Sequence, residues 1–238
     1  MPKLSVVIPT LNEKENPYFL KILESWLGHE EIEVIVSDGG SVDDTFSCCS
    51  RFNVKYLSNK TTSRAERINL GIRESSSEMI LLQHPRSLVS KEGIKYLLQN
   101  ATILSWGGFL HSFDLEHPLL KFTSWYSNRV RGSLSGILYL DHCIFLKKTM
   151  ALSIGDLPSV DIFEDTILSQ KLLKKFGKPK ILPHKVTTSA VRFRTNGIFK
   201  QSLMNQYLKV KFYLGADHRQ MNILYERNTG LNSKYDNE

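Results

Sequence analysis

Two apolar runs near the N-terminus constrain the fold more than any other feature of the chain. Residues 4–13 read LSVVIPTLNE and residues 34–45 read VIVSDGGSVDDT, so each run ends abruptly in small and polar residues. Apolar runs without alternation are typical of strands buried on both faces of a parallel sheet. Helix-like sequence separates these runs from shorter ones at 54–57 and 79–82. This order predicts an α/β fold with a mostly parallel, doubly wound sheet and helices on both faces.

The second half of the chain is less regular and predicts a mixed arrangement. The expected elements are an exposed strand at 106–114, a helix to about 131, a strand at 137–146, a helix at 165–176, a strand at 185–193 and an amphipathic helix at 198–214, in addition to an earlier helix at 62–75. We interpret residues 1–227 as one domain with two halves, 1–100 and 101–227. A polar tail follows at 228–238.

Composition narrows the class of protein but not its activity. The chain is 41% hydrophobic and 23% charged, which is typical of a globular protein. Its net charge of +7 favours an anionic partner such as a nucleotide, a phosphorylated acceptor or a membrane surface. Nucleic-acid binding would rest on charge alone, and we expect none. Cys48, Cys49 and Cys143 have neither a disulfide pattern nor zinc spacing and are expected to be reduced thiols.

The chain shows no signal peptide and no apolar stretch long enough to span a bilayer, so we expect a cytoplasmic location. Peripheral contact with the inner face of the membrane stays open because residues 198–214 combine basic and apolar side chains. The alternative, which we prefer, is that this helix packs on the core.

Polar residues at the ends of the first two strands predict a ligand crevice. In open α/β sheets, ligands bind outside the carboxyl ends of the strands. The residues at these two ends are Pro9, Thr10, Asn12, Glu13, Asp38 and Gly39. Asp38 offers acceptors to a ribose or a base, and the adjacent glycines allow close approach of the backbone. Because neither a G-x-G-x-x-G nor a G-K-[ST] motif is present, dinucleotide and P-loop sites are disfavoured.

Four further clusters could carry chemistry, and each also has a structural explanation. Arg64 suits a phosphate or base contact, or surface pairing. The pair Glu164 and Asp165 opens a helix, where it could supply a general base or act only as a cap. The remaining two clusters are Asp141 with His142, which interrupt an apolar run, and Arg192 with Arg194, which would share one face of a strand.

Taken together, these residues resemble a family 2 glycosyltransferase with the GT-A nucleotide-sugar-binding fold. The resemblance extends from Leu4 to about Tyr225 and is closest to the branch called radical-SAM/selenodomain-associated transferases. The motifs that carry it are VSDGGS at 36–41, Arg64 with Asn69-Leu-Gly71, Gly108-Phe109, Asp141, Phe163-Glu-Asp165, Ser189 with Arg192, and Leu214-Gly215.

The resemblance implies a transfer of a sugar from a UDP- or GDP-type donor to a hydroxyl of an unknown glycan, lipid or small-molecule acceptor. It makes residues 1–100 the nucleotide-binding half and residues 101–227 the acceptor and catalytic half. It places the nucleotide on the strand-end residues and Arg64. Asp165 would be the general base of an inverting displacement, with Glu164 beside it. Asp141, His142 and Arg194 would line the donor or acceptor pocket, and Arg192 would contact the diphosphate.

The chain departs from the family pattern at the end of the fourth strand. Where the family has D-x-D, or His-Ala-Asp in this branch, the chain has His84-Pro85-Arg86. The permanent charge of Arg86 disfavours Mg²⁺ or Mn²⁺ and predicts that a guanidinium stabilises the diphosphate instead. The alternatives are a catalytically inactive protein of the same fold that binds a nucleotide-sugar or glycan, and a metal held by another carboxylate. A nucleotidyltransferase is disfavoured because its glycine-rich loop is absent.

Overall fold

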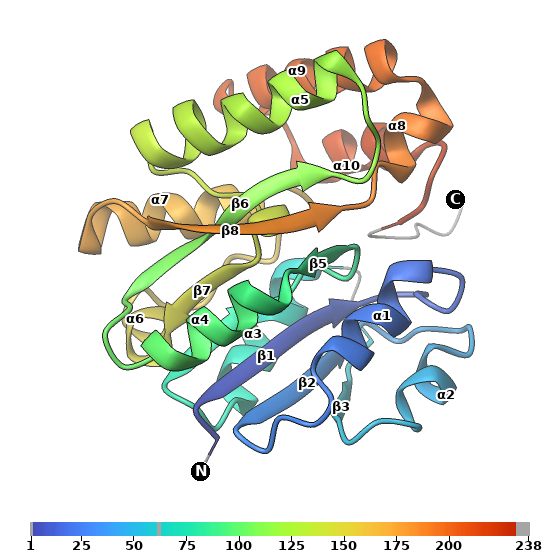
Figure 1. Ribbon diagram of the computed structural model, residues 1–238. Helices are drawn as coiled ribbons and strands as arrows, with labels where there is room; N and C mark the ends of the chain where they lie inside the picture. Colours follow the sequence, from blue (N-terminus) through green and yellow to red (C-terminus); the bar gives the residue numbers. More distant parts are fainter. Residues whose placement is uncertain (1, 61–62, 232–238) are drawn as a thin grey trace.

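The computed structural model describes residues 2–60 and 63–231 and contains one curled sheet of eight strands with helices around it (Figure 1). The strands are β1 (Leu4–Thr10), β2 (Ile32–Asp38), β3 (Lys55–Ser58), β4 (Met79–Leu82), β5 (Ser87–Val89), β6 (Trp106–Phe113), β7 (Ile144–Lys147) and β8 (Lys180–Thr188). Their order is β3-β2-β1-β4-β7-β6-β8-β5. The first four are parallel, β7 is antiparallel to both of its neighbours, and β6 and β8 are parallel.

Helices connect the strands and cover the sheet. They are α1 (Pro17–Ser25), α2 (Thr45–Cys49), α3 (Arg64–Glu74), α4 (Lys91–Asn100), α5 (Pro118–Tyr126), α6 (Lys148–Ser153), α7 (Glu164–Phe176), α8 (Val191–Asn196), α9 (Ile198–Tyr213) and α10 (His218–Glu226), with a π-helical continuation of α5 at Ser127–Leu134 and a 3-10 turn at Leu140–His142. Residues of α1, α2 and α4 pack on one face of the sheet, and residues of α3, α6 and α7 pack on the other. The predicted fold class is confirmed.

Strand β1 shows why uniformly apolar runs occur in this sheet. Leu4, Val6 and Ile8 join the core on one face, and Val7 joins the core on the other. All seven residues of β1 are buried. Helix α3 approaches so closely that a Cβ at Gly71 would lie 2.2 Å from a methyl group of Val7. The predicted helix at 62–75 is therefore present as α3, although Thr62 lies outside the described residues.

The predicted strand at 137–146 is wrong over its first half. The backbone N–H of Leu138 donates to Ser169 Oγ, and that of Leu140 donates to an Asp165 carboxylate oxygen. Since these bonds lead to α7, the segment forms a 3-10 turn that contains Asp141 and His142, and only β7 joins the sheet.

The expected strand at 185–193 begins earlier and ends earlier than predicted. It is β8, which stops at Thr188, because Ala190 N–H donates to the Asp114 carboxylate and the chain turns into α8. Arg192 and Arg194 therefore lie on a helix and not on one face of a strand. The strand at 106–114 is present as β6, but it is not exposed, because β7 and β8 flank it and Trp106 and Phe109 are buried.

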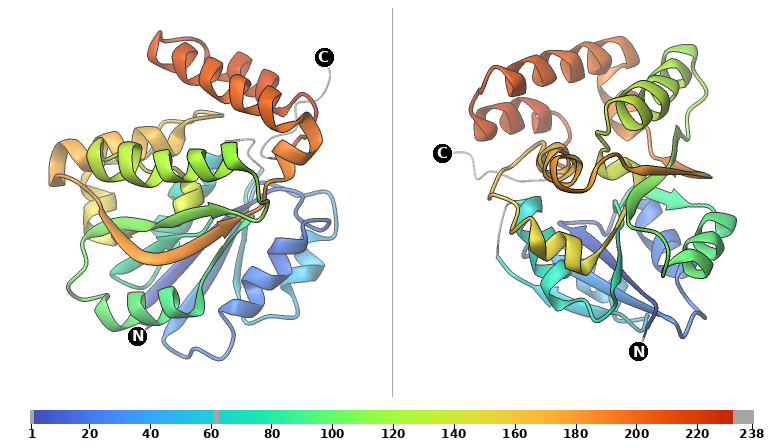
Figure 2. Two further views of the ribbon diagram at one scale, coloured as in Figure 1. Left: turned by 45° about the horizontal axis from the view of Figure 1, so that its top comes forward. Right: turned by 90° about the vertical axis from the view of Figure 1, so that its left-hand side faces the viewer.

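Helices α5 and α9 lie at one end of the molecule, beyond β6 and β8 (Figure 2). The expectation that α9 packs on the core holds for one face of the helix, where Met204, Leu208 and Phe212 pack with Ile162 and Met221, whereas the opposite face is exposed. In the described part of the chain, no helix is long and apolar enough to cross a membrane.

Candidate active site

A cavity of about 210 Å³ lies beside the C-terminal end of β4. The loop after β4 supplies His84 and Arg86, and the first turn of α7 supplies Asp165. The opposite walls come from the segment after α5 and from α8, α9 and the stretch after α10. Of the residues that the sequence singled out, the cavity brings together Arg64, Arg86, Asp141, Asp165 and Arg192.

The residues at the ends of β1 and β2 lie close together but do not line the cavity. Thr10 Oγ1 donates to Asp38 across 3.1 Å, and both side chains are buried. Asp38 also accepts from the backbone N–H groups of Gly40 and Ser41 at 2.8 and 2.7 Å. Asn12 has a φ of 53° and accepts from Val42 N–H. These bonds hold the two strand-end loops together. The nucleotide-binding roles of Pro9, Thr10, Asn12, Asp38 and Gly39 stay predictions.

Glu13 and Arg86 form a two-point ion pair at the edge of the cavity. One guanidinium nitrogen lies 2.7 Å from a Glu13 oxygen, and the other lies 3.1 Å from the second oxygen. Asn16 donates to Glu13 at 2.9 Å and to Pro85 O at 2.7 Å, which ties the pair to the loop after β4. Burial raises the pKa of Glu13 even though Arg86 opposes that change, and burial lowers the pKa of Arg86.

The residues present do not fit a divalent cation at this position. A guanidinium occupies the place of the acidic ligand, and its neighbour Glu13 already neutralises it. Within residues 2–60 and 63–231, no three His, Cys, Asp or Glu side chains form a group that could hold a metal ion.

The structure separates the roles of Glu164 and Asp165. Glu164 is fully buried and forms an ion pair with Arg64, so it does not face the cavity. Asp165 faces the cavity and accepts from the backbone N–H groups of Leu140 and Thr166 at 2.8 and 2.7 Å. Burial, together with the Glu164 carboxylate, raises the pKa of Asp165 to about 7. A carboxylate with such a pKa is suited to accept a proton near neutral pH.

Asp141 lines the cavity and lies close to the buried ring of His111. One Asp141 oxygen lies 3.5 Å from His111 Nε2. His142 lies outside the cavity, within 2.8 Å of both Ser127 Oγ and Phe109 O. Burial lowers the pKa of His142 to about 3, so its ring is neutral at physiological pH.

Arg192 and Arg194 point in different directions. Arg192 lines the cavity, pairs with Glu226 at 2.6 Å and lies 3.9 Å above the Tyr225 ring. Arg194 pairs with Asp114 at 3.0 Å and lies outside the cavity. The structure therefore does not place Arg194 in the expected pocket.

Sequence reasoning missed Arg131, Tyr139 and Lys209, which line the other end of the cavity. The guanidinium carbon of Arg131 lies 3.4 Å from the centre of the Tyr139 ring, and Lys209 Nζ lies 5.8 Å from it. Burial and the nearby Arg131 lower the pKa of Lys209 to about 8. No local pattern marks Lys209 as a site residue, and it lines the cavity together with Ser202, two turns earlier in α9.

Comparisons with known proteins bear on the fold and on the first half of the chain. Residues 5–103 match the family model described as Glycosyl transferase family 2. No curated protein matches the chain. Among solved structures, S. aureus TarS has a TM-score of 0.64 at 15% identity, covering 94% of this chain and 42% of its own. Its 1–349 fragment in complex with UDP has a TM-score of 0.62 at 17% identity, covering 96% and 74%.

A third structure is glucosyl-3-phosphoglycerate synthase from Mycobacterium tuberculosis in complex with Mn²⁺, UDP and glucosyl-3-phosphoglycerate. Its TM-score is 0.59 at 15% identity, and the match covers 97% of this chain and 81% of that one. The sheet order and the cavity beside β4 thus define a GT-A fold. The match to the family 2 glycosyltransferase model covers residues 5–103, within the first half of the chain. It spans under half the length of full TarS.

Proposed function

We propose that the chain transfers a sugar from a nucleoside-diphosphate sugar to an acceptor hydroxyl, with inversion at the anomeric carbon. The observation that carries this proposal is the position of Asp165, whose carboxylate faces a cavity that also receives Arg64, Arg86 and Arg192. A base and several fixed cations are what a displacement with a diphosphate leaving group requires. TarS and the M. tuberculosis synthase, which share the fold, have been solved with UDP.

In this mechanism, Asp165 removes the proton from the acceptor hydroxyl as its oxygen attacks the anomeric carbon. The bond from that carbon to the diphosphate oxygen breaks, and the negative charge on the leaving group increases. Arg86 and Arg192 then donate charge-assisted hydrogen bonds to the diphosphate, in the place that a metal takes in other enzymes. Glu13 acts through Arg86, and Glu164 acts through Arg64, since each carboxylate fixes the guanidinium that it pairs with.

The test is release of UDP or GDP from a panel of nucleotide-sugars in the presence of EDTA, for the wild type and two variants. Asp165→Asn is expected to lower the rate at least a hundredfold while nucleotide binding is kept, because only the base is lost. Glu164→Gln is the matched control at the adjacent position; it should lower nucleotide affinity or stability more than the chemical step.

The alternative of an inactive nucleotide-sugar-binding protein makes a different prediction. It requires that the wild type bind a nucleotide-sugar but form no UDP or GDP from it, at any pH and with any metal. Activity that EDTA abolishes and Mn²⁺ restores would instead refute the role given to Arg86.

A further inference from the structure

Helix α9 presents apolar side chains on two opposite faces. Met204, Leu208 and Phe212 face the protein, where they pack with Ile162 and Met221. The other face is exposed to solvent and carries Phe199, Leu203, Tyr207, Val210, Tyr213 and the following Leu214. Phe199 and Leu203 are each 74% exposed. A helix that is apolar on both sides is expected to be covered on both sides.

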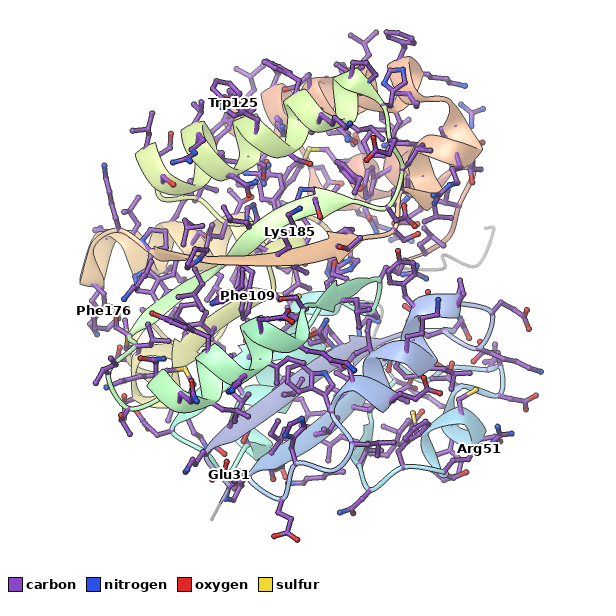
Figure 3. The ribbon with its side chains drawn as sticks, viewed as in Figure 1. Glu31, Arg51, Phe109, Trp125, Phe176 and Lys185 are labelled. Carbon is purple, nitrogen blue, oxygen red and sulfur yellow. The ribbon has the colours of Figure 1, made fainter. Side chains whose placement is uncertain are left out.

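Helix α5 adds an aromatic surface at the same end of the molecule. Phe122, Trp125 and Tyr126 are exposed, and the rings of Phe122 and Trp125 stack with their centres 5.7 Å apart. Figure 3 shows Trp125 on the side of α5 that points away from the sheet. Because Trp and Tyr are enriched where a protein meets a membrane–water interface, this composition favours a lipid surface.

The N-terminal ends of the two helices are in contact, and residues of both helices or of the segment after α5 line the cavity. The ring of His117, at the start of α5, lies 6.0 Å from the ring of Phe199 at the start of α9. The cavity is lined by Thr123 and Ser127 on one side and by Ser202 and Asn205 on the other. We define the outer face as the exposed apolar residues of α5 and α9 named above.

Positive charge predominates around the outer face, although Glu116, just before α5, pairs with Lys121 at 2.6 Å. Residues 118–134 and 198–214 contain no Asp or Glu. They contain six basic residues: Lys121, Arg129, Arg131, Lys200, Lys209 and Lys211. Of these, Lys121, Arg129, Lys200 and Lys211 are exposed. A second copy of the chain would bring two such basic faces together in a self-complementary contact, and like charges would repel. An anionic surface is the complementary partner.

We propose that the outer face docks the protein on the surface of a membrane that contains anionic lipids. The aromatic and aliphatic side chains enter the interface, and the lysines contact the lipid headgroups, as in peripheral proteins held by apolar burial and charge together. The side of the cavity that is lined by the α5 and α9 regions then lies toward the lipid. The proposal stands on the exposed surface alone and does not depend on the glycosyltransferase activity.

The experiment is co-sedimentation of the full chain with vesicles of phosphatidylglycerol and phosphatidylcholine, compared with phosphatidylcholine alone, at two salt concentrations. Binding is expected only with the anionic vesicles, and it should weaken at high salt. Trp125→Ser with Leu203→Ser should lower the partition coefficient by about tenfold or more, because exposed apolar area no longer enters the lipid. Lys200→Gln with Lys211→Gln should lower it by about 25-fold, at roughly fivefold for each lysine.

The matched controls are Ile103→Ser, at an equally exposed residue outside the outer face, and Lys95→Gln in α4. Both should bind as the wild type does. The proposal is overturned if the anionic vesicles do not bind the wild type, or if the outer-face and control variants bind equally. Self-association in analytical ultracentrifugation that Trp125→Ser with Leu203→Ser abolishes would assign the face to a second copy instead.

Discussion

The ion pair of Glu13 with Arg86 allows two effects of Glu13 on Arg86 to be tested separately: its negative charge and its hold on the orientation of the guanidinium. Glu13→Gln keeps the shape of the side chain and an oxygen that can accept from Arg86, but it removes the negative charge. The pair is buried, with side-chain exposures of 1% for Glu13 and 8% for Arg86, and it is joined at two points. Loss of one partner from such a pair costs about 3–5 kcal/mol because the other charge is left uncompensated. For a domain of this size, that corresponds to a fall in Tm of about 10 °C.

Nucleotide binding should change in the opposite direction. Without Glu13, the Arg86 guanidinium no longer shares its charge with a carboxylate, and a bound diphosphate becomes its counterion. We expect Glu13→Gln to bind UDP or GDP about tenfold more tightly, since an uncompensated cation strengthens a charge-assisted hydrogen bond by about 1.4 kcal/mol. Arg86→Gln should lose stability and also bind the nucleotide at least tenfold more weakly. The double variant should recover part of the stability, because both charges are gone.

The assay combines urea denaturation, for the free energy of unfolding, with calorimetric titration of UDP and GDP. The control is Glu31→Gln, which breaks the exposed pair of Lys3 with Glu31 and should cost less than about 1 kcal/mol. If Glu13→Gln weakens UDP binding as much as Arg86→Gln does, Glu13 is itself a nucleotide ligand and the reasoning is refuted.

Two further predictions concern Asp165 and Gly107. The pKa of Asp165 is about 7 in the folded chain against 3.8 for an ordinary aspartate. The free energy of unfolding therefore falls as the pH rises from about 4 to about 7, because the unfolded chain ionises this group first. The Tm difference between Asp165→Asn and the wild type should therefore become more positive from pH 5 to pH 8, and a constant difference in thermal melts would contradict the raised pKa. A Cβ at Gly107 would lie 1.9 Å from Lys180 O in the paired strand, so Gly107→Ala should cost about 3 kcal/mol or more in urea denaturation. Gly155→Ala, which meets no atom within 4 Å but has a φ of +70°, should cost only about 1 kcal/mol.

The sequence predicts the first half of the fold well because the signal there is local. A strand buried on both faces needs apolar residues at every position, and β4 at Met79–Leu82 has the bounds that its apolar run predicts. The second half depends on contacts between distant residues. Ser169 and Asp165 decide whether 137–146 forms one strand, because their side chains accept hydrogen bonds from backbone N–H groups of this segment. No pattern within that segment carries this information.

The site shows the same division between local and distant signals. The Glu164-Asp165 pair was visible as a motif, but which carboxylate faces the cavity follows from the pairing of Glu164 with Arg64, a hundred positions earlier in the chain. Arg131 and Lys209 appear in the sequence as ordinary basic residues of surface helices. They become part of the site only because the α5 and α9 regions lie on either side of one cavity.

Three arginines of the cavity are each held by a carboxylate from another part of the chain: Arg64 by Glu164, Arg86 by Glu13 and Arg192 by Glu226. Such pairs contribute little net stability compared with apolar residues of the same size, so stability does not account for three of them in one site. Orientation does, because a guanidinium that is already held by a carboxylate meets a ligand without first losing side-chain freedom. Each arginine is therefore better treated as half of a unit than as an independent ligand. Isosteric amide substitution of the carboxylate, as in Glu13→Gln, removes its negative charge and leaves the orientation of the paired guanidinium largely in place.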